Sequence, residues 1–108
     1  MLPLPLTMAC GPYDRTQALR DGSVKVEGVD LNFINIDSPR EIFDRMAGGQ
    51  EFDACEFSSS EFISRFSANQ CPFVALPVFP SRVFRHGHIS INEDSGIRSA
   101  KDLVGKRI

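Results

Sequence analysis

The sequence predicts an α/β fold, a doubly wound and mostly parallel sheet with helices on both faces. Three observations predict it: strand-like and helix-like segments alternate along the chain, Ser and Pro stand at the helix starts, and glycines follow two of the helices. The chain has 108 residues, of which 42% are hydrophobic and 24% charged, and this is typical of about one small globular domain.

The first unit runs from an apolar strand to a short helix and on to a second strand. A strand is expected over residues 4–9, because this apolar run leads into the turn signal Gly11-Pro12. Residues 13–21 are expected to form a short helix. Residues 29–36 alternate apolar and polar side chains, which is the period of a half-buried strand.

The next helix is expected to start at Ser38. Ser38 can cap the helix, Pro39 suits its first position, and Glu41 completes a capping box. Gly48-Gly49 is expected to end it. The predicted buried stripe consists of Ile42, Phe43, Met46 and Ala47.

The same unit then recurs. Residues 52–57 predict a short strand, and Ser58 with Glu61 predicts a second capping box. The inner face of that helix is expected to carry Phe62, Ile63 and Phe66. Further along, the sequence predicts an apolar run over 73–79, a strand over 84–91 and a helical turn that starts at Ser99 with Asp102.

Residues 106–108 resemble the first residues of one more strand. Parallel sheets are buried on both faces, so a chain that stops there predicts an incomplete layer. We therefore expect residues 1–108 to be a partial N-terminal α/β lobe of a longer polypeptide. Such a lobe exposes apolar surface, which favours association with the missing part or a homo-oligomer.

Composition excludes several classes of partner. No apolar run approaches the roughly 18 residues of a membrane span, and a net charge of −2 argues against a nucleic-acid or membrane surface. Nine of the twelve basic residues are Arg, whose planar fork fits carboxylates and phosphates. This bias favours a small anionic ligand, although a GC-rich genome explains it equally well.

The three cysteines are an odd set without a C-x-x-C pair, which argues against a disulfide framework and a structural zinc site. The N-terminal segment has no basic region and two prolines interrupt its apolar stretch, so it does not have the pattern of a secretory signal. We expect a cytoplasmic protein.

Three segments fall where doubly wound folds bind ligands, at the carboxyl ends of strands: residues 10–15, 53–60 and 77–86. Each segment also has a purely structural interpretation. Residues 13–15 can be a solvated first helical turn, Ser58 a cap, Glu56 a surface acid, and the arginines of the third segment partners of any carboxylate.

Two other chemistries have little support. His86 and His88 could share one face of a strand, but zinc sites usually need three or four ligands, so no metal is predicted. No G-x-S-x-G motif is present, which argues against a serine hydrolase of that type.

The motifs ACGPYDR, FDACEFS and FPSRVFRH give the chain a resemblance to the N-terminal portion of the 4,5-dihydroxyphthalate decarboxylase family. KDLVGKRI is shared more widely and supports only the fold. That family is similar in fold to type 2 periplasmic binding proteins, which hold a ligand between two α/β lobes. The resemblance implies that this chain holds most of the first lobe and none of the second, so the fragment alone is expected to be inactive.

The resemblance also implies a function, a cofactor-independent lyase that decarboxylates a dihydroxylated aromatic diacid. Arginine side chains would clamp its carboxylates, His86 would exchange the proton, and Glu56 would accept from a phenolic hydroxyl. Tyr13 and Ser58 would orient the ring. The arginines that match the motifs are Arg15, Arg82 and Arg85.

A second hypothesis is a non-catalytic solute-binding protein of an ABC transporter for a small carboxylate or another organic anion. It would use the same cleft and the same arginines without chemistry. A binding protein of this kind needs a signal peptide or lipid anchor, and the N-terminal residues offer neither pattern. A ligand-sensing regulatory lobe is a third and weaker interpretation, since no DNA-binding segment supports it.

Overall fold

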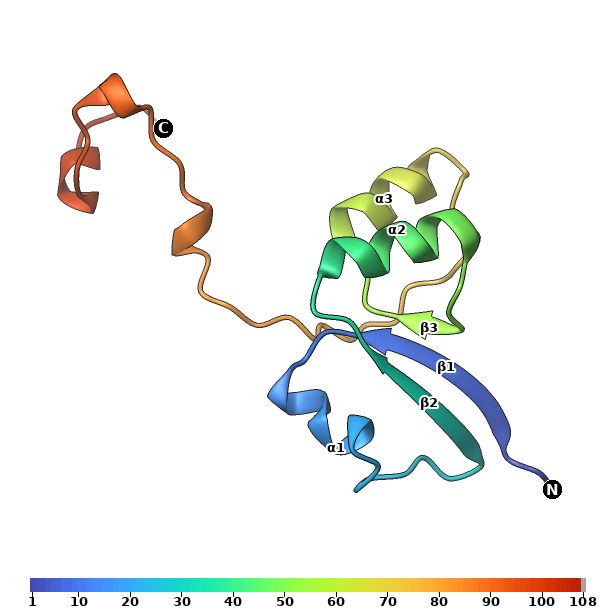
Figure 1. Cartoon of the computed structure of the whole chain (residues 1–108). Coiled ribbons are helices and arrows are strands. Elements are labelled where there is room, and N and C mark those ends of the chain that lie inside the picture. The colour runs from blue at the N-terminus through green and yellow to red at the C-terminus, as the bar shows by residue number, and fades with distance from the viewer. Residues whose placement is uncertain (108) are drawn as a thin grey trace.

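The computed structural model describes residues 1–107, and its body is a three-stranded parallel sheet with flanking helices (Figure 1). The strands are β1 (Leu4–Cys10), β2 (Val29–Asn35) and β3 (Ala54–Cys55), in the order β2-β1-β3. A 3₁₀ turn and α1 (Gln17–Arg20) connect β1 to β2. The predicted α/β class is confirmed.

Two longer helices complete the body. Helix α2 (Pro39–Gly49) connects β2 to β3, and α3 (Ser59–Ser67) follows β3. They lie on the opposite side of the sheet from α1 (Figure 1). For α1 and α2 this arrangement follows from handedness, because right-handed crossovers that run in opposite directions across a sheet put their helices on opposite faces.

The core lies between the sheet and α2. Its fully buried centre is Ile42, and Phe57 extends it with edge-to-face contacts to Phe43 and Phe73 at ring-centroid distances of 5.5 and 4.9 Å. The buried hydrophobic cluster consists of Ala9, Ile36, Ile42, Met46 and Phe52. Ile42 and Met46 were both expected on the buried stripe.

The start and the end of α2 differ from the prediction. The helix begins at Pro39 as expected, but the Ser38 side chain makes no cap hydrogen bond, so the first capping box is wrong. The Glu41 carboxylate pairs with Arg45 instead, at 3.2 Å. The helix includes both glycines and is capped by Gln50, which adopts the left-handed conformation with φ 48°.

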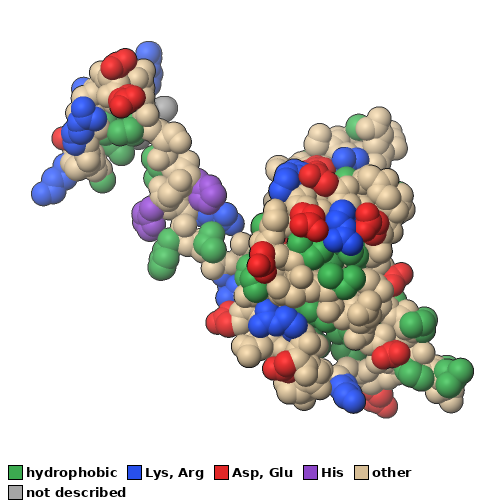
Figure 2. Space-filling view, viewed as in Figure 1, with side chains coloured by type: hydrophobic (Ala, Val, Ile, Leu, Met, Phe, Trp, Pro, Cys, Tyr) green, Lys and Arg blue, Asp and Glu red, His purple; other side chains and the backbone are tan. Residues whose placement is uncertain are grey.

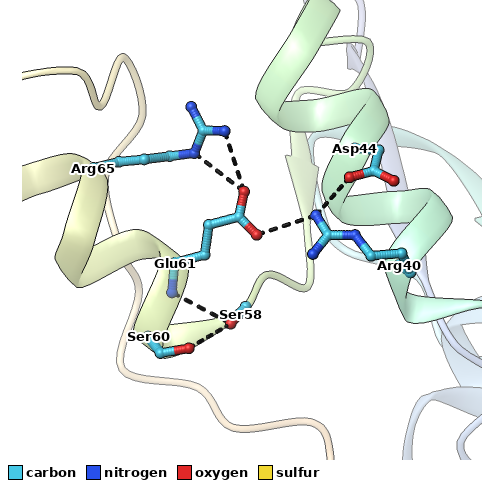
Figure 3. Close-up of polar contacts among 6 residues, drawn as sticks. All are labelled: Arg40, Asp44, Ser58, Ser60, Glu61 and Arg65. Atoms are coloured by element: carbon cyan, nitrogen blue, oxygen red, sulfur yellow. Dashed lines mark hydrogen bonds and ion pairs between the residues drawn. The ribbon is translucent and has the colours of Figure 1, made fainter.

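Helix α3 begins with the expected serine cap, since Ser58 Oγ accepts the N–H of Glu61 at 3.3 Å. The Glu61 carboxylate does not complete the predicted second capping box, which is therefore wrong in this half: it turns toward two arginines instead (Figure 3). Its oxygens accept from Arg40 of α2 at 3.1 Å and from Arg65 at 3.2 Å, while Arg40 also pairs with Asp44. These ion pairs tie α3 to α2.

The predicted inner face of α3 is only partly covered. Phe62 is partly buried and lies near Phe73, but Ile63 and Phe66 are 63% and 66% exposed, so their predicted burial is wrong. The reason is that only two residues of the predicted strand over 52–57 pair with β1. The sheet therefore offers α3 little surface to cover.

Residues beyond Pro80 leave the body as an extended segment (Figure 1). The radius of gyration is 19.0 Å, against roughly 13 Å for a compact domain of this length. The strand predicted over 84–91 is wrong: this stretch has a 3₁₀ turn at His86–His88, and Phe84 is 88% exposed. No neighbouring strand lies beside it in the described residues, and a parallel strand does not form alone.

Two further predictions concern the last residues. The capping box of Ser99 and Asp102 is confirmed, and it starts a short 3₁₀ helix over Ala100–Leu103. Lys106 and Arg107 are not in a strand, and Ile108 lies outside the described residues. Within the part of the chain that the structure describes, no helix is long and apolar enough to cross a membrane.

We predict that Ile42→Ala lowers the free energy of unfolding by about 2–5 kcal/mol, because it leaves a cavity at the centre of the core. Ile63→Ala is the matched control, since this isoleucine is mostly exposed and its truncation is expected to cost less than about 0.5 kcal/mol. Urea denaturation of both variants measures the difference. Equal losses would contradict the described core.

Candidate functional site

The candidate site lies where the carboxyl ends of β1 and β3 meet. From β1 the chain moves outward to β2, and α2 then brings it back past β1 to β3. The loops after β1 and β3 consequently depart toward opposite faces of the sheet. In open α/β sheets this reversal leaves a crevice at the strand ends, and ligands bind there.

Glu56 is the residue that joins the two loops. It follows β3 directly, and it is only 8% exposed. Its Oε1 accepts the Gly11 N–H at 2.8 Å, and its Oε2 accepts the Tyr13 hydroxyl at 2.7 Å. Its own N–H donates to the Ala9 carbonyl at 3.1 Å. A buried carboxylate is tolerated because both of its oxygens have donors.

Gly11 is required by the close approach of these groups. A Cβ atom on Gly11 would lie 3.0 Å from Glu56 Oε1 and 3.2 Å from the Tyr13 ring. A side chain at this position would require the carboxylate and the ring to shift by a few tenths of an ångström. The sequence analysis used Gly11 only as a turn signal and missed this role, although a glycine directly after a strand was the available signal.

The titration of the neighbouring groups follows from burial and from the Glu56 charge. Burial, and then the hydrogen bond to Glu56, raises the pKa of Tyr13 to about 12, so the phenol keeps its proton at neutral pH. Burial, and then the same carboxylate, raises the pKa of Cys10 and of Cys55 to about 11. Both cysteines are thiols at neutral pH and are poor nucleophiles.

The third predicted segment, residues 77–86, also contacts the loop that carries Tyr13. Arg15 Nη2 donates to the Pro80 carbonyl at 2.7 Å, its Nη1 pairs with Asp14 at 2.8 Å, and its guanidinium carbon lies 5.4 Å from the centre of the Tyr13 ring. Ser81, which follows Pro80 in the chain, lowers the pKa of Tyr13 and so offsets part of the rise caused by burial and Glu56. All three predicted segments therefore meet around Tyr13.

The other predicted site residues lie apart from this cluster. Ser58 Oγ caps α3 and lies 3.1 Å from Ser60 Oγ. Arg82, Arg85 and His86 are exposed in the extended segment, and within residues 1–107 no hydrogen bond or ion pair joins them to Tyr13 or Glu56. The structure thus brings together Tyr13, Arg15 and Glu56 but not the remaining four.

Neither of the two best-formed surface hollows contains the cluster. One of about 510 Å³ lies over the middle of β1 and β2, and one of about 300 Å³ lies beside α1. The chemistry-bearing side chains gather at the strand ends instead, so we take the strand ends as the candidate site. Among the described residues, no three His, Cys, Asp or Glu side chains are grouped to hold a metal ion.

No protein-family model matches the chain. Two curated proteins do: a 4,5-dihydroxyphthalate decarboxylase of Comamonas testosteroni, 44% identical over 108 residues, and one of Pseudomonas putida, 47% identical over 105 residues. These matches cover 100% and 97% of this chain but only 32% and 40% of the relatives. The resemblance predicted from the sequence is confirmed, and the coverage is consistent with an N-terminal portion.

We predict that Tyr13 titrates near pH 12 and that Glu56→Gln moves its pKa down toward the ordinary value of about 10. The raised pKa means that folding favours the protonated phenol. This stabilisation is fully present below about pH 10 and is lost as the pH rises through about 12. Phenolate absorbance follows the titration, since Tyr13 is the single tyrosine of the chain.

Two controls assign that signal. Tyr13→Phe identifies the absorbance of Tyr13, and Glu93→Gln removes an exposed carboxylate far along the chain and should leave the titration unchanged. A Tyr13 pKa that stays the same in Glu56→Gln would contradict the hydrogen bond between the two side chains.

Proposed function

We propose that the chain supplies part of the active site of a cofactor-independent decarboxylase for a dihydroxylated aromatic diacid of the 4,5-dihydroxyphthalate type. The observation that carries the proposal is the cluster of Tyr13, Arg15 and Glu56 at the strand ends, where a cation and a polarised hydroxyl lie side by side. The names of the two curated relatives support the same reaction. The chain spans about a third of their length, so the remaining part of the site would come from elsewhere.

The reaction needs little from the protein beyond position and proton transfer. A ring hydroxyl para to the departing carboxylate pushes electrons into the ring, and the ring carbon takes a proton. The carbon–carboxylate bond then breaks and CO₂ leaves, while the second carboxylate stays on the ring. One proton is consumed for each CO₂ released, and no oxidant or reductant is required.

The proposed carboxylate clamp consists of Arg15, Arg82 and Arg85. A charge-assisted pair between guanidinium and carboxylate contributes roughly 1.5–3 kcal/mol when it is desolvated. Arg15 already lies beside Tyr13 at the strand ends, where its present partners are Asp14 and the Pro80 carbonyl. A bound carboxylate would replace one of them.

The proposed acid–base pair is His86 and Glu56. His86 comes six residues after Pro80, which Arg15 holds at the crevice, and six extended residues span at most roughly 20 Å. His86 can therefore reach the ring carbon if the segment folds back. Both oxygens of Glu56 already accept hydrogen bonds, so Glu56 would act on the phenolic hydroxyl of the ligand through Tyr13 and not by direct contact. Ser58 would orient the ring from the start of α3.

The surrounding architecture belongs to the same proposal. We infer that residues 1–108 form most of the first lobe of a two-lobed fold like that of type 2 periplasmic binding proteins, in a cytoplasmic protein whose exposed apolar surface is covered by the missing part or by a second copy of the chain. The exposed apolar side chains of the extended segment support a missing partner surface. The non-catalytic transporter alternative has no observation in its favour, since both relatives are named as enzymes.

We predict that His86→Gln lowers turnover by roughly 10²-fold or more if His86 is the general acid. Arg82→Ala should mainly raise KM, because it removes binding and not proton transfer. The measurement is chromatographic detection of the decarboxylated product from 4,5-dihydroxyphthalate, with the protein as its native gene encodes it.

His88→Gln is the matched control, since it changes the other histidine of the same turn. An unchanged rate in His86→Gln would remove His86 from the mechanism. Ligand-induced thermal stabilisation without product would refute the decarboxylase and support the binder.

A further inference from the structure

The direction of the hydrogen bonds around Tyr13 is set by the Glu56 carboxylate, which can only accept. The Gly11 N–H can only donate, so the oxygen that it meets on residue 56 must accept. As a carboxylate, Glu56 has only acceptors, so the Tyr13 hydroxyl must donate its single proton to Oε2. The phenolic oxygen then has only lone pairs left for any further partner.

The surroundings of Tyr13 agree with this direction. The side chain of Ser81 is a hydroxyl, and it lowers the pKa of Tyr13, as a donor to the phenolic oxygen does. The Arg15 guanidinium, which carries donors only, lies over the ring. Tyr13 is partly exposed, so a ligand can reach it from solvent.

We propose that Glu56 is a positioning residue that makes Tyr13 an acceptor-only contact, so that the crevice selects ligands presenting a hydroxyl donor at this point. The ligand class rests on the proposed function: an aromatic diacid would place a ring hydroxyl on Tyr13 and a carboxylate on the arginines. In an analogue whose ring oxygens carry no protons, the lone pairs of a ring oxygen would face the lone pairs of the Tyr13 oxygen, and no hydrogen bond could form. The expected discrimination is about 10- to 100-fold in affinity.

Substitution of Glu56 by glutamine reverses this polarity without changing the size of the side chain. The Gly11 N–H still requires an acceptor, so the amide oxygen of Gln takes the place of Oε1. The amide NH₂ then faces Tyr13 and donates to it, and the phenolic proton turns outward. Tyr13 becomes able to donate to a ligand oxygen.

Isothermal titration calorimetry with 4,5-dihydroxyphthalate and 4,5-dimethoxyphthalate tests the inference on the protein as its native gene encodes it. The unmodified protein should prefer the dihydroxy ligand by about 10- to 100-fold. Glu56→Gln should bind the dimethoxy ligand about 10-fold more tightly than the unmodified protein does. Tyr13→Phe should lose the preference for the dihydroxy ligand and should not bind the dimethoxy ligand more tightly. Glu93→Gln should change the affinity for neither ligand.

A merely structural role of Glu56 would weaken both ligands equally in Glu56→Gln, and that result overturns the inference. Tyr13→Phe tests the inference even where Glu56→Gln fails to fold, and a Tyr13→Phe protein that keeps the full preference for the dihydroxy ligand overturns it. Failure of the unmodified protein to bind either ligand overturns it as well. Because binding is measured without turnover, the two proposals fail separately. Preference without product refutes the decarboxylase alone, and product without preference refutes this inference alone.

Discussion

The buried carboxylate of Glu56 is the contact on which the candidate site depends. It is the first residue after β3, and it holds the loop after β1 through the Gly11 N–H and the Tyr13 hydroxyl. A buried charge that loses a partner costs several kcal/mol, so the two loops are held together or the local structure is lost. The same contact sets the titration and the hydrogen-bond direction of Tyr13, and with them what the crevice can bind.

The extended segment is the second feature that bears on the site, because no described residue covers most of its apolar side chains. Its first residues are fixed at the crevice by the bond from Arg15 to Pro80, and the rest carries exposed apolar side chains away from the body (Figure 2). Phe84, Ile89 and Val104 all expose most of their surface. Burial of such side chains is worth about 25 cal/mol per Å², so a surface that covers them would stabilise the segment considerably. The histidines and two of the proposed arginines lie in or next to this part.

The sequence predicted the elements whose signals are local. The alternation over β2, the proline at the start of α2 and the serine caps of α3 and the last 3₁₀ helix all report on a few neighbouring residues. The predicted strand over 84–91 failed because strand formation needs a neighbour, which the period of a segment does not reveal. The predicted burial of Ile63 was wrong for the same reason, since burial depends on what lies opposite a helix face.

At the site, the three segments that carry Arg15, Glu56 and His86 were predicted to meet because parallel strands end at one edge of the sheet. Arg15 and Glu56 do meet around Tyr13, but His86 lies apart in the extended segment. The contacts themselves were not predictable. Which oxygen of Glu56 meets Gly11, and that Arg15 holds a backbone carbonyl, depend on loop conformations that no residue pattern specifies.

A double-mutant cycle of Tyr13→Phe and Glu56→Ala on the free energy of unfolding tests most directly whether one carboxylate holds the two loops together, because alanine leaves Tyr13 without a replacement hydrogen bond. Hydrogen bonds to charged groups contribute about 1.5–3 kcal/mol, so the two substitutions should be coupled by an energy of that order. Strictly additive losses would mean that the two side chains act independently, and the described crevice would then lose its basis.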